Sequence, residues 1–152
     1  MKKENRQKSE INIKVILLGE SAVGKAYLKY IYLGKEWNDL TFLNDNSMRS
    51  SLIIEKSDII LNVDNWDTVD QEKFLSIKRK FIKGSNIILL IYDITRYETF
   101  LELEYWYNAA IEETRGDEDV VFGIVANKID LFERYQVEKE LGERMASSIG
   151  AF

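Results

Sequence analysis

Gly19-Glu20-Ser21-Ala22-Val23-Gly24-Lys25 is the stretch that decides the fold of this chain. It follows a run of β-branched and apolar residues at 11–18 and precedes apolar residues at helical spacing in 25–35. A strand, a glycine-bounded loop and a helix in this order form the setting of a Walker A phosphate loop. The backbone N–H groups of such a loop surround a phosphate, and Lys25 adds a cation for the outer phosphates. The simpler alternative, a glycine-bounded turn with a solvated lysine, is disfavoured by the flanking strand and helix.

One position departs from the Walker A pattern. The residue after the lysine is usually Ser or Thr, because its hydroxyl is a ligand of Mg²⁺. Here that residue is Ala26, whose methyl group cannot bind a cation. Water could take the place of the hydroxyl, since Mg²⁺ usually keeps several waters. We therefore expect a weaker dependence on Mg²⁺ and a poorer hold on a triphosphate.

The remainder of the chain alternates apolar strands with helical patterns, which predicts an α/β domain with a mostly parallel sheet. Strands are expected over 11–18, 49–55, 58–66, 86–92 and 120–126, and helices over 25–35, 71–82, 97–114 and 133–149. Residues 1–10 are expected to form a disordered lead-in, 36–46 a loop, and 56–57 a hairpin turn. Ligands bind beyond the carboxyl ends of the strands in such sheets. The chemistry is therefore expected in the loops at Gly19, Asp67, Asp93 and Asn127.

The composition narrows the possible functions. A chain of 152 residues fits one domain, and its formal net charge of -5 disfavours nonspecific binding to nucleic acid. Cysteine and histidine are both absent, which excludes disulfides, thiolate nucleophiles, histidine triads, the usual zinc sites and a cysteine-linked lipid anchor in this sequence. No apolar run reaches the length of a membrane span. We expect an intracellular protein, cytosolic or peripherally bound to endomembranes through other sequence or partners.

Asn127-Lys128-Ile129-Asp130 follows directly from the expected strand 120–126. Alone, this tetrapeptide is equally consistent with a helix N-cap or a turn. After a phosphate loop it suggests base recognition, because a carboxylate at Asp130 can accept hydrogen bonds from N1–H and the 2-amino group of guanine. Adenine lacks that pair of donors, so the wrong base would leave the carboxylate unpaired.

With these loops in place, the chain resembles a Ras-superfamily small GTPase, closest to the Rab branch. Residues 19–25 match the phosphate loop in a form that some Rab proteins use, and 127–130 match the base motif. Residues 66–74, WDTVDQEKF, resemble the Rab segment WDTAGQERF. The likeness continues through 74–85 and through IYDIT at 91–95 with Phe100, and it spans about residues 11–150.

The resemblance implies a P-loop NTPase fold of the Ras type, with three layers and a mostly parallel sheet, binding GTP or GDP. It implies nucleotide-binding roles for Ser21, Ala22, Val23, Gly24, Lys25, Ala26, Tyr27, Trp37, Asn127, Lys128 and Asp130. Asn127 would join the base loop to the phosphate loop, and Lys128 would cover the ring. Trp37 would lie beside the base, or would equally be ordinary packing. Asp67 would hold Mg²⁺ through water, and Gln71 would orient the attacking water.

The switch regions depart from the family. Asp70 replaces a glycine whose N–H contacts the γ-phosphate, and its carboxylate adds a like charge near that phosphate. We therefore expect a site that tolerates GDP better than GTP, or a second switch that does not contact the nucleotide in either the GTP-bound or the GDP-bound state. Thr41 is the candidate for the Mg²⁺-binding threonine of the first switch, but the spacing points to Asn44, and a loop without a Mg²⁺ contact is as good an interpretation.

The resemblance also implies a last strand with an S-A-K loop and a final helix, neither of which this sequence contains. We therefore expect a Rab-like domain over 11–152 that is incomplete at its C-terminus, either part of a longer or tandem protein or completed by a partner. The leading hypothesis is a slow GTPase of the Rab type in vesicle trafficking, protein transport or signalling, with regulatory and effector proteins as partners. The alternative is a pseudo-GTPase interaction module with little turnover. An adenine-nucleotide enzyme is disfavoured by Asp130.

Overall fold

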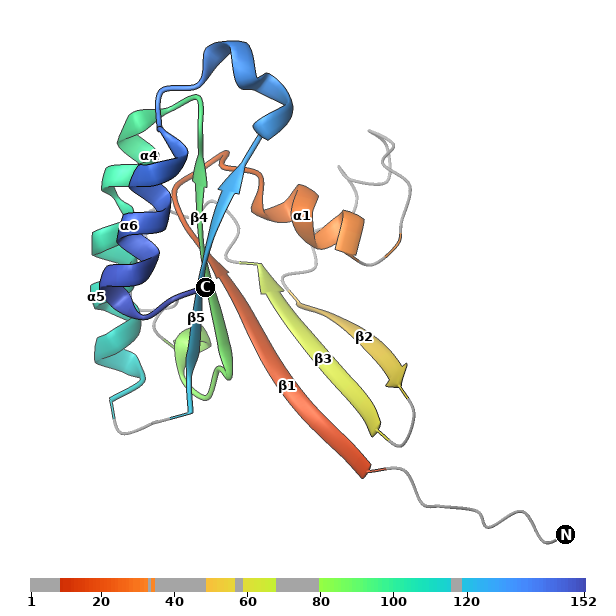
Figure 1. The fold of residues 1–152 in the computed structure, drawn as a ribbon. Helices are drawn as coiled ribbons and strands as arrows, with labels where there is room; N and C mark the ends of the chain where they lie inside the picture. The colour runs from red at the N-terminus through yellow and green to blue at the C-terminus, as the bar shows by residue number, and fades with distance from the viewer. Residues whose placement is uncertain (1–8, 33, 35–48, 57–58, 68–79, 116–118) are drawn as a thin grey trace, which may run out of the picture.

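The computed structural model describes residues 9–32, 34, 49–56, 59–67, 80–115 and 119–152 (Figure 1). The strands are β1 (Ser9–Leu18), β2 (Arg49–Lys56), β3 (Ile59–Asp67), β4 (Ile87–Asp93) and β5 (Val121–Asn127). The helices are α1 (Lys25–Tyr32), α4 (Tyr97–Leu101), α5 (Leu103–Glu113), α6 (Lys139–Ile149) and the 3₁₀ helix η1 (Ile129–Arg134). No helix in these ranges is long and apolar enough to cross a membrane.

The strands form one five-stranded sheet in the order β2-β3-β1-β4-β5. β1 pairs in parallel with β3 and with β4, and β4 pairs in parallel with β5. Only the outer strand β2 runs antiparallel to its neighbour, β3. This arrangement confirms the predicted α/β class with a mostly parallel sheet.

Helices cover both faces of the sheet, with α1 on one side and α4, α5 and α6 on the other (Figure 1). Alternate residues of β1 serve the two faces: Ile16 and Leu18 belong to the core beneath α5, and Val15 and Leu17 to the core on the α1 side. A strand segment that is covered on both faces has no polar side, which explains the unbroken apolar runs at 15–18 of β1 and at 87–92 of β4.

Two predicted boundaries at the N-terminal side are corrected. β1 begins at Ser9 rather than at residue 11, because Ser9 and Glu10 already pair with Ile59 and Ile60 of β3. Residues 9 and 10 are thus part of the sheet and not of a disordered lead-in. The predicted turn at 56–57 is also corrected, since Lys56 pairs with Ile59 as the last residue of β2, and residues 57–58 lie outside the described residues.

The predicted helix over 133–149 is wrong in its first part. Residues between η1 and α6 leave the helical path because the N–H groups of Gln136 and Val137 donate to the carbonyl of Ile94, at 2.6 and 3.2 Å. Val137 is buried in the core, so an apolar position that suggested helical periodicity anchors an extended segment instead. The predicted helix over 97–114 is divided into α4 and α5 at Glu102, which keeps right-handed backbone angles.

Of the predicted helix over 71–82, the structure describes residues 80–82, which are helical. The predicted loop at 36–46 lies outside the described residues.

Candidate functional site

Three loops meet at the carboxyl ends of adjacent parallel strands. Because β1, β4 and β5 are neighbours in the sheet, the phosphate loop after β1, the turn after β4 and the tetrapeptide at the end of β5 lie next to one another. Asp67 ends β3 opposite Leu17 of β1, which places its backbone beside the start of the phosphate loop. The sheet order therefore gathers the loops that the sequence singled out.

The glycines at both ends of the phosphate loop are required by close approaches. A Cβ at Gly19 would collide with the carbonyl oxygen of Ile91 in β4. A Cβ at Gly24 would collide with the side-chain amide of Asn127, and Gly24 also has a φ of +98°. Because that angle is unfavourable for residues with a side chain, Gly24 is constrained twice. The loop thus fits closely between β4 and the base tetrapeptide.

Lys25 is held over the beginning of the same loop. Its Nζ donates to the carbonyl of Gly19 at 2.9 Å and to that of Glu20 at 2.7 Å. Only 5% of the residue is exposed. A buried ammonium needs partners of this kind, and the two carbonyls keep it at the mouth of the loop, where a phosphate would supply the compensating negative charge.

Asn127 joins the phosphate loop to the base tetrapeptide. Its Nδ2 donates to the carbonyl of Val23 at 2.7 Å, and its own carbonyl accepts from the N–H of Ile94 at 3.2 Å. The contact between the two loops that was expected of Asn127 is thus present. One side chain fixes the distance between the parts that would hold the phosphates and the base.

Asp93, the last residue of β4, is the charged centre of the site. It is fully buried, and its carboxylate accepts from the N–H and the Oγ1 of Thr95, at 2.9 and 2.6 Å. Its Oδ2 lies 2.6 Å from Nζ of Lys128 and 3.3 Å from Nε of Arg96. Burial raises the pKa of Asp93, but the hydrogen bonds from Lys128 and Thr95 and the charge of Lys128 outweigh it, so the pKa lies below its usual value.

Two further contacts reach the phosphate loop from the α5 face of the sheet. Nη2 of Arg96 donates to the carbonyl of Ser21 at 2.7 Å. Nε1 of Trp106 in α5 donates to a carboxylate oxygen of Glu20 at 3.3 Å. Asp93, Arg96 and Trp106 were not among the predicted site residues. Asp93 alone carried a signal, as a charged residue that ends a buried strand.

The remaining predicted residues divide into two groups. Ala26 is half-buried at the start of α1, Tyr27 is exposed, and Asp130 is exposed at the start of η1. Lys128, just before η1, has a left-handed φ of 64°. Trp37, Thr41, Asn44, Asp70 and Gln71 lie outside the described residues.

The described residues do not fit a complete magnesium site. Among them, no group of three or more Asp, Glu, His or Cys side chains could hold a metal ion. The methyl group of Ala26, in the first turn of α1, cannot bind a cation.

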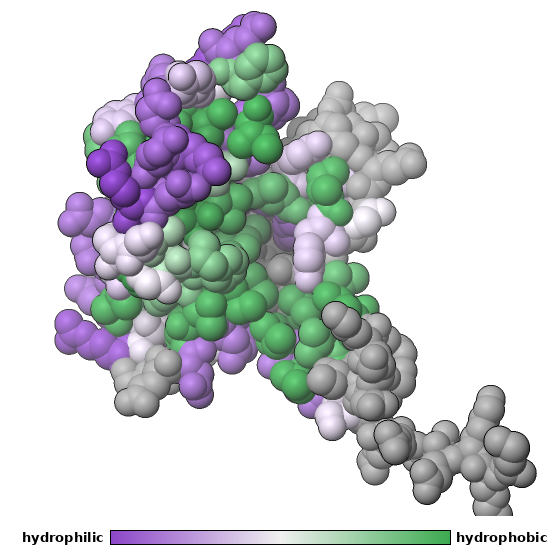
Figure 2. Space-filling model, in the orientation of Figure 1, coloured by the Kyte–Doolittle hydropathy of each residue, from purple (hydrophilic) through white to green (hydrophobic). Residues whose placement is uncertain are grey.

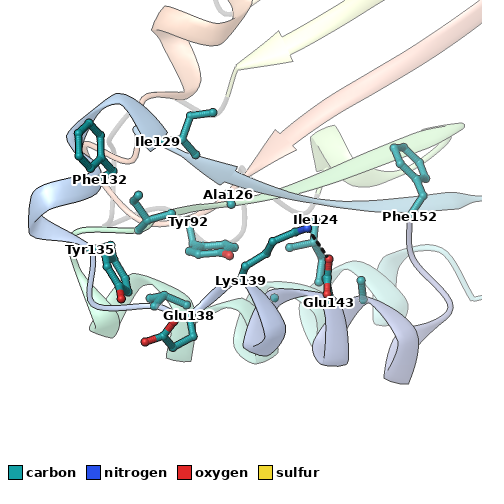
Figure 3. A pocket seen from close by; sticks show the side chains of 14 residues that line it. Tyr92, Ile124, Ala126, Ile129, Phe132, Tyr135, Glu138, Lys139, Glu143 and Phe152 are labelled. Atoms are coloured by element: carbon teal, nitrogen blue, oxygen red, sulfur yellow. Dashed lines mark ion pairs between the residues drawn. The ribbon is translucent and has the colours of Figure 1, made fainter.

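A groove of about 540 Å³ lies apart from the phosphate loop, between the outer edge of β5, η1 and α6 (Figure 3). Tyr92, Ile124, Phe132 and Phe152 contribute to its mostly apolar lining, and the ion pair between Lys139 and Glu143 lies along it. Figure 2 shows the apolar side chains gathered on this face, beside the polar surface of α6. Its mostly apolar lining distinguishes the groove from the phosphate loop.

Comparison with known proteins agrees with the arrangement of the loops. The model of the Ras family matches residues 14–152. The Ras-related protein RABC2b of Arabidopsis thaliana is 31% identical over 142 residues, which are 92% of this chain and 68% of that protein.

Proposed function

The chain belongs to the Ras family of small GTPases and is Rab-like, and from that premise we propose that it is a guanine-nucleotide switch of the Rab type with slow GTP hydrolysis. Members of this family bind GTP or GDP with Mg²⁺ and interact with regulatory proteins. A role in vesicle trafficking or signalling is part of the proposal and rests on the likeness to the Rab branch.

The observation that carries the proposal is the hydrogen bond from Asn127 to the carbonyl of Val23. It holds the tetrapeptide that would read the base against the loop that would hold the phosphates. A single nucleotide has a base and a phosphate chain at a fixed separation, so a rigid connection between their two loops favours binding by reducing the ordering that binding requires.

Guanine recognition is assigned to Asp130. Its exposed carboxylate can accept from N1–H and from the 2-amino group of guanine, and the ammonium of Lys128 is held by Asp93 so that its aliphatic stem can lie along the ring. A base that lacks these donors would leave the carboxylate desolvated and unpaired, which costs about 1–3 kcal/mol or more. This supports guanine over adenine.

Phosphate binding is assigned to Lys25 and to the amides of residues 21–25. GTP hydrolysis, if it occurs, would use Gln71 to orient the attacking water, while Lys25 and the loop amides stabilise the transferring charge. Because Ala26 lacks the hydroxyl and Asp70 replaces the glycine of the second switch, we propose a rate at or below roughly 10⁻³ per second, typical of unassisted GTPases. Multiple turnovers per minute by the purified protein would contradict this.

The nucleotide that co-purifies with the chain tests the proposal. The purified protein is denatured, and the released nucleotide is identified and counted by chromatography. GDP or GTP near one per chain is the expected result. ADP or ATP would contradict the assignment of Asp130, and a site that stays empty after incubation with GDP would favour the interaction module over the switch.

A further inference from the structure

Arg96 lies between the buried carboxylate of β4 and the phosphate loop. Its Nε is 3.3 Å from Oδ2 of Asp93, and its Nη2 donates to the carbonyl of Ser21 at 2.7 Å. The side chain of Asp93 is 1% exposed and that of Arg96 is 37% exposed. One end of the guanidinium is therefore anchored in the protein interior while the other holds a loop carbonyl, a task that suits a rigid planar group better than a flexible ammonium.

The bond to Ser21 also sets the direction of the next amide. The peptide between Ser21 and Ala22 is trans, so its C=O and its N–H point in opposite directions. A donor that holds the Ser21 carbonyl on the side of Arg96 therefore turns the N–H of Ala22 to the other side. Ala22 has a left-handed φ of 59°, which a residue with a Cβ adopts only when its surroundings impose it.

Other carbonyls of the loop are held in the same manner. Lys25 donates hydrogen bonds to the carbonyls of Gly19 and Glu20, and Asn127 donates one to the carbonyl of Val23. Lys25 and Asn127 belong to the two motifs of the family, whereas Arg96 belongs to neither. Ser21, whose carbonyl Arg96 contacts, follows Glu20, whose carbonyl the Lys25 ammonium contacts. In a Walker A loop this lysine binds the outer phosphates, so Ser21 belongs to the part of the loop near them.

We propose that Arg96 is a positioning residue of the nucleotide site. Anchored by Asp93, it holds the peptide between Ser21 and Ala22 with the N–H of Ala22 set toward the phosphates beyond the first. The inference rests on the proposed guanine-nucleotide function and adds a residue to it. Arg96 does not touch the nucleotide; it presets an amide that does, and it does so before the ligand arrives.

The test uses the full chain with Arg96→Gln, which removes the charge and the reach to Ser21, and Arg96→Lys, which keeps the charge without the planar fork. Asp93 is unsuitable for the purpose because Lys128 shares it. Arg144→Gln is the matched control, since Arg144 lies on the exposed side of α6 and its Nε donates to the carbonyl of Glu140 in the same helix. Dissociation of fluorescent GDP, competition by GMP and by GDP, and the melting temperature of the nucleotide-free protein are measured.

Arg96→Gln is expected to speed GDP dissociation about 10-fold, the effect of one charge-assisted hydrogen bond, and to leave the affinity for GMP within about 2-fold. Arg96→Lys should fall between Arg96→Gln and the wild type, and Arg144→Gln should match the wild type. Equal losses for GMP and GDP together with a lower melting temperature would show a merely structural role and overturn the proposal. Unchanged GDP dissociation in both Arg96 variants would overturn it as well, while a wild type that binds neither nucleotide would overturn the proposed function and this inference together.

Discussion

Nζ of Lys128 lies 2.6 Å from Oδ2 of Asp93, so the lysine of the base tetrapeptide is paired with the last residue of the neighbouring strand β4. The carboxylate is 1% exposed and the lysine side chain 32% exposed. The ion pair therefore attaches the base tetrapeptide to the end of β4, while the aliphatic stem of the lysine stays partly exposed and can contact a ligand. It also makes the stability of the site depend on one buried negative charge.

Asp93→Asn should lower the free energy of unfolding by about 1–3 kcal/mol. The amide keeps the shape of the side chain and can still accept from Thr95, but it no longer balances Lys128. Urea denaturation measures the change. Glu143→Gln is the control, because its pair with Lys139 is exposed on both sides and should contribute less than about 0.5 kcal/mol. Equal losses in the two variants would contradict a special role of the buried pair.

Acid should weaken the protein through the same carboxylate. The pKa of Asp93 is lower in the folded state than in the unfolded chain, where a typical value is about 3.9. The folded state therefore binds this proton less readily, so the stabilisation is complete above the unfolded pKa and is lost as the pH falls through the folded one. The difference in unfolding free energy between wild type and Asp93→Asn should be constant above about pH 5 and shrink below about pH 4. A difference that shrinks toward neutral pH instead would have the wrong sign.

The sequence predicted the parts of the molecule that obey a local rule. The strands β1 and β4 were foreseen because each contains an apolar run, at 15–18 and at 87–92, and the loops 19–25 and 127–130 because they match sequence motifs. The position at which α6 begins was predicted wrongly because the N–H groups of Gln136 and Val137 donate to the carbonyl of Ile94, which is distant in sequence. Local periodicity contains no information about such a partner.

The missed site residues have the same explanation. Arg96 reaches Ser21 across 75 positions of sequence, and Trp106 reaches Glu20 across 86. Both contacts exist because β1 and β4 are neighbours in the sheet. Only the order of the strands, which no single segment encodes, brings these side chains to the phosphate loop.

Asp130→Asn should change the preferred base. The amide offers one donor and one acceptor, which matches a base with an N1–H and a 2-carbonyl, such as xanthine, and it leaves the 2-amino group of guanine facing an N–H donor. Binding of GDP should weaken about 100-fold or more while binding of xanthosine diphosphate improves. Competition titrations give both constants. Glu133→Gln, an exposed acid in the same helix η1, should change neither.

Asp70→Gly should raise the affinity for GTP relative to GDP. In the family pattern this position adjoins the γ-phosphate, so glycine there would allow more backbone conformations and would take away a like charge from that phosphate. We expect the ratio of the GTP and GDP affinities to rise roughly 10-fold, as an effect of about 1.4 kcal/mol would produce. Nucleotide titrations of both proteins measure the ratio. A wild type that clearly prefers GTP, with the preference lost in Asp70→Gly, would contradict the expectation.

Ala26→Thr should make nucleotide retention more dependent on magnesium. The threonine supplies the hydroxyl that residue 26 lacks, at the start of α1 and directly after Lys25. The rate of GDP release is measured with Mg²⁺ and with a chelator, and the ratio of the two rates should grow about 10-fold in Ala26→Thr, the equivalent of one bond worth about 1.4 kcal/mol. Ala26→Val is the matched control, because valine has the shape of threonine without the oxygen. If valine raises the ratio as much as threonine does, the gain comes from the packing of the larger side chain at the start of α1, and the hydroxyl has no part in it.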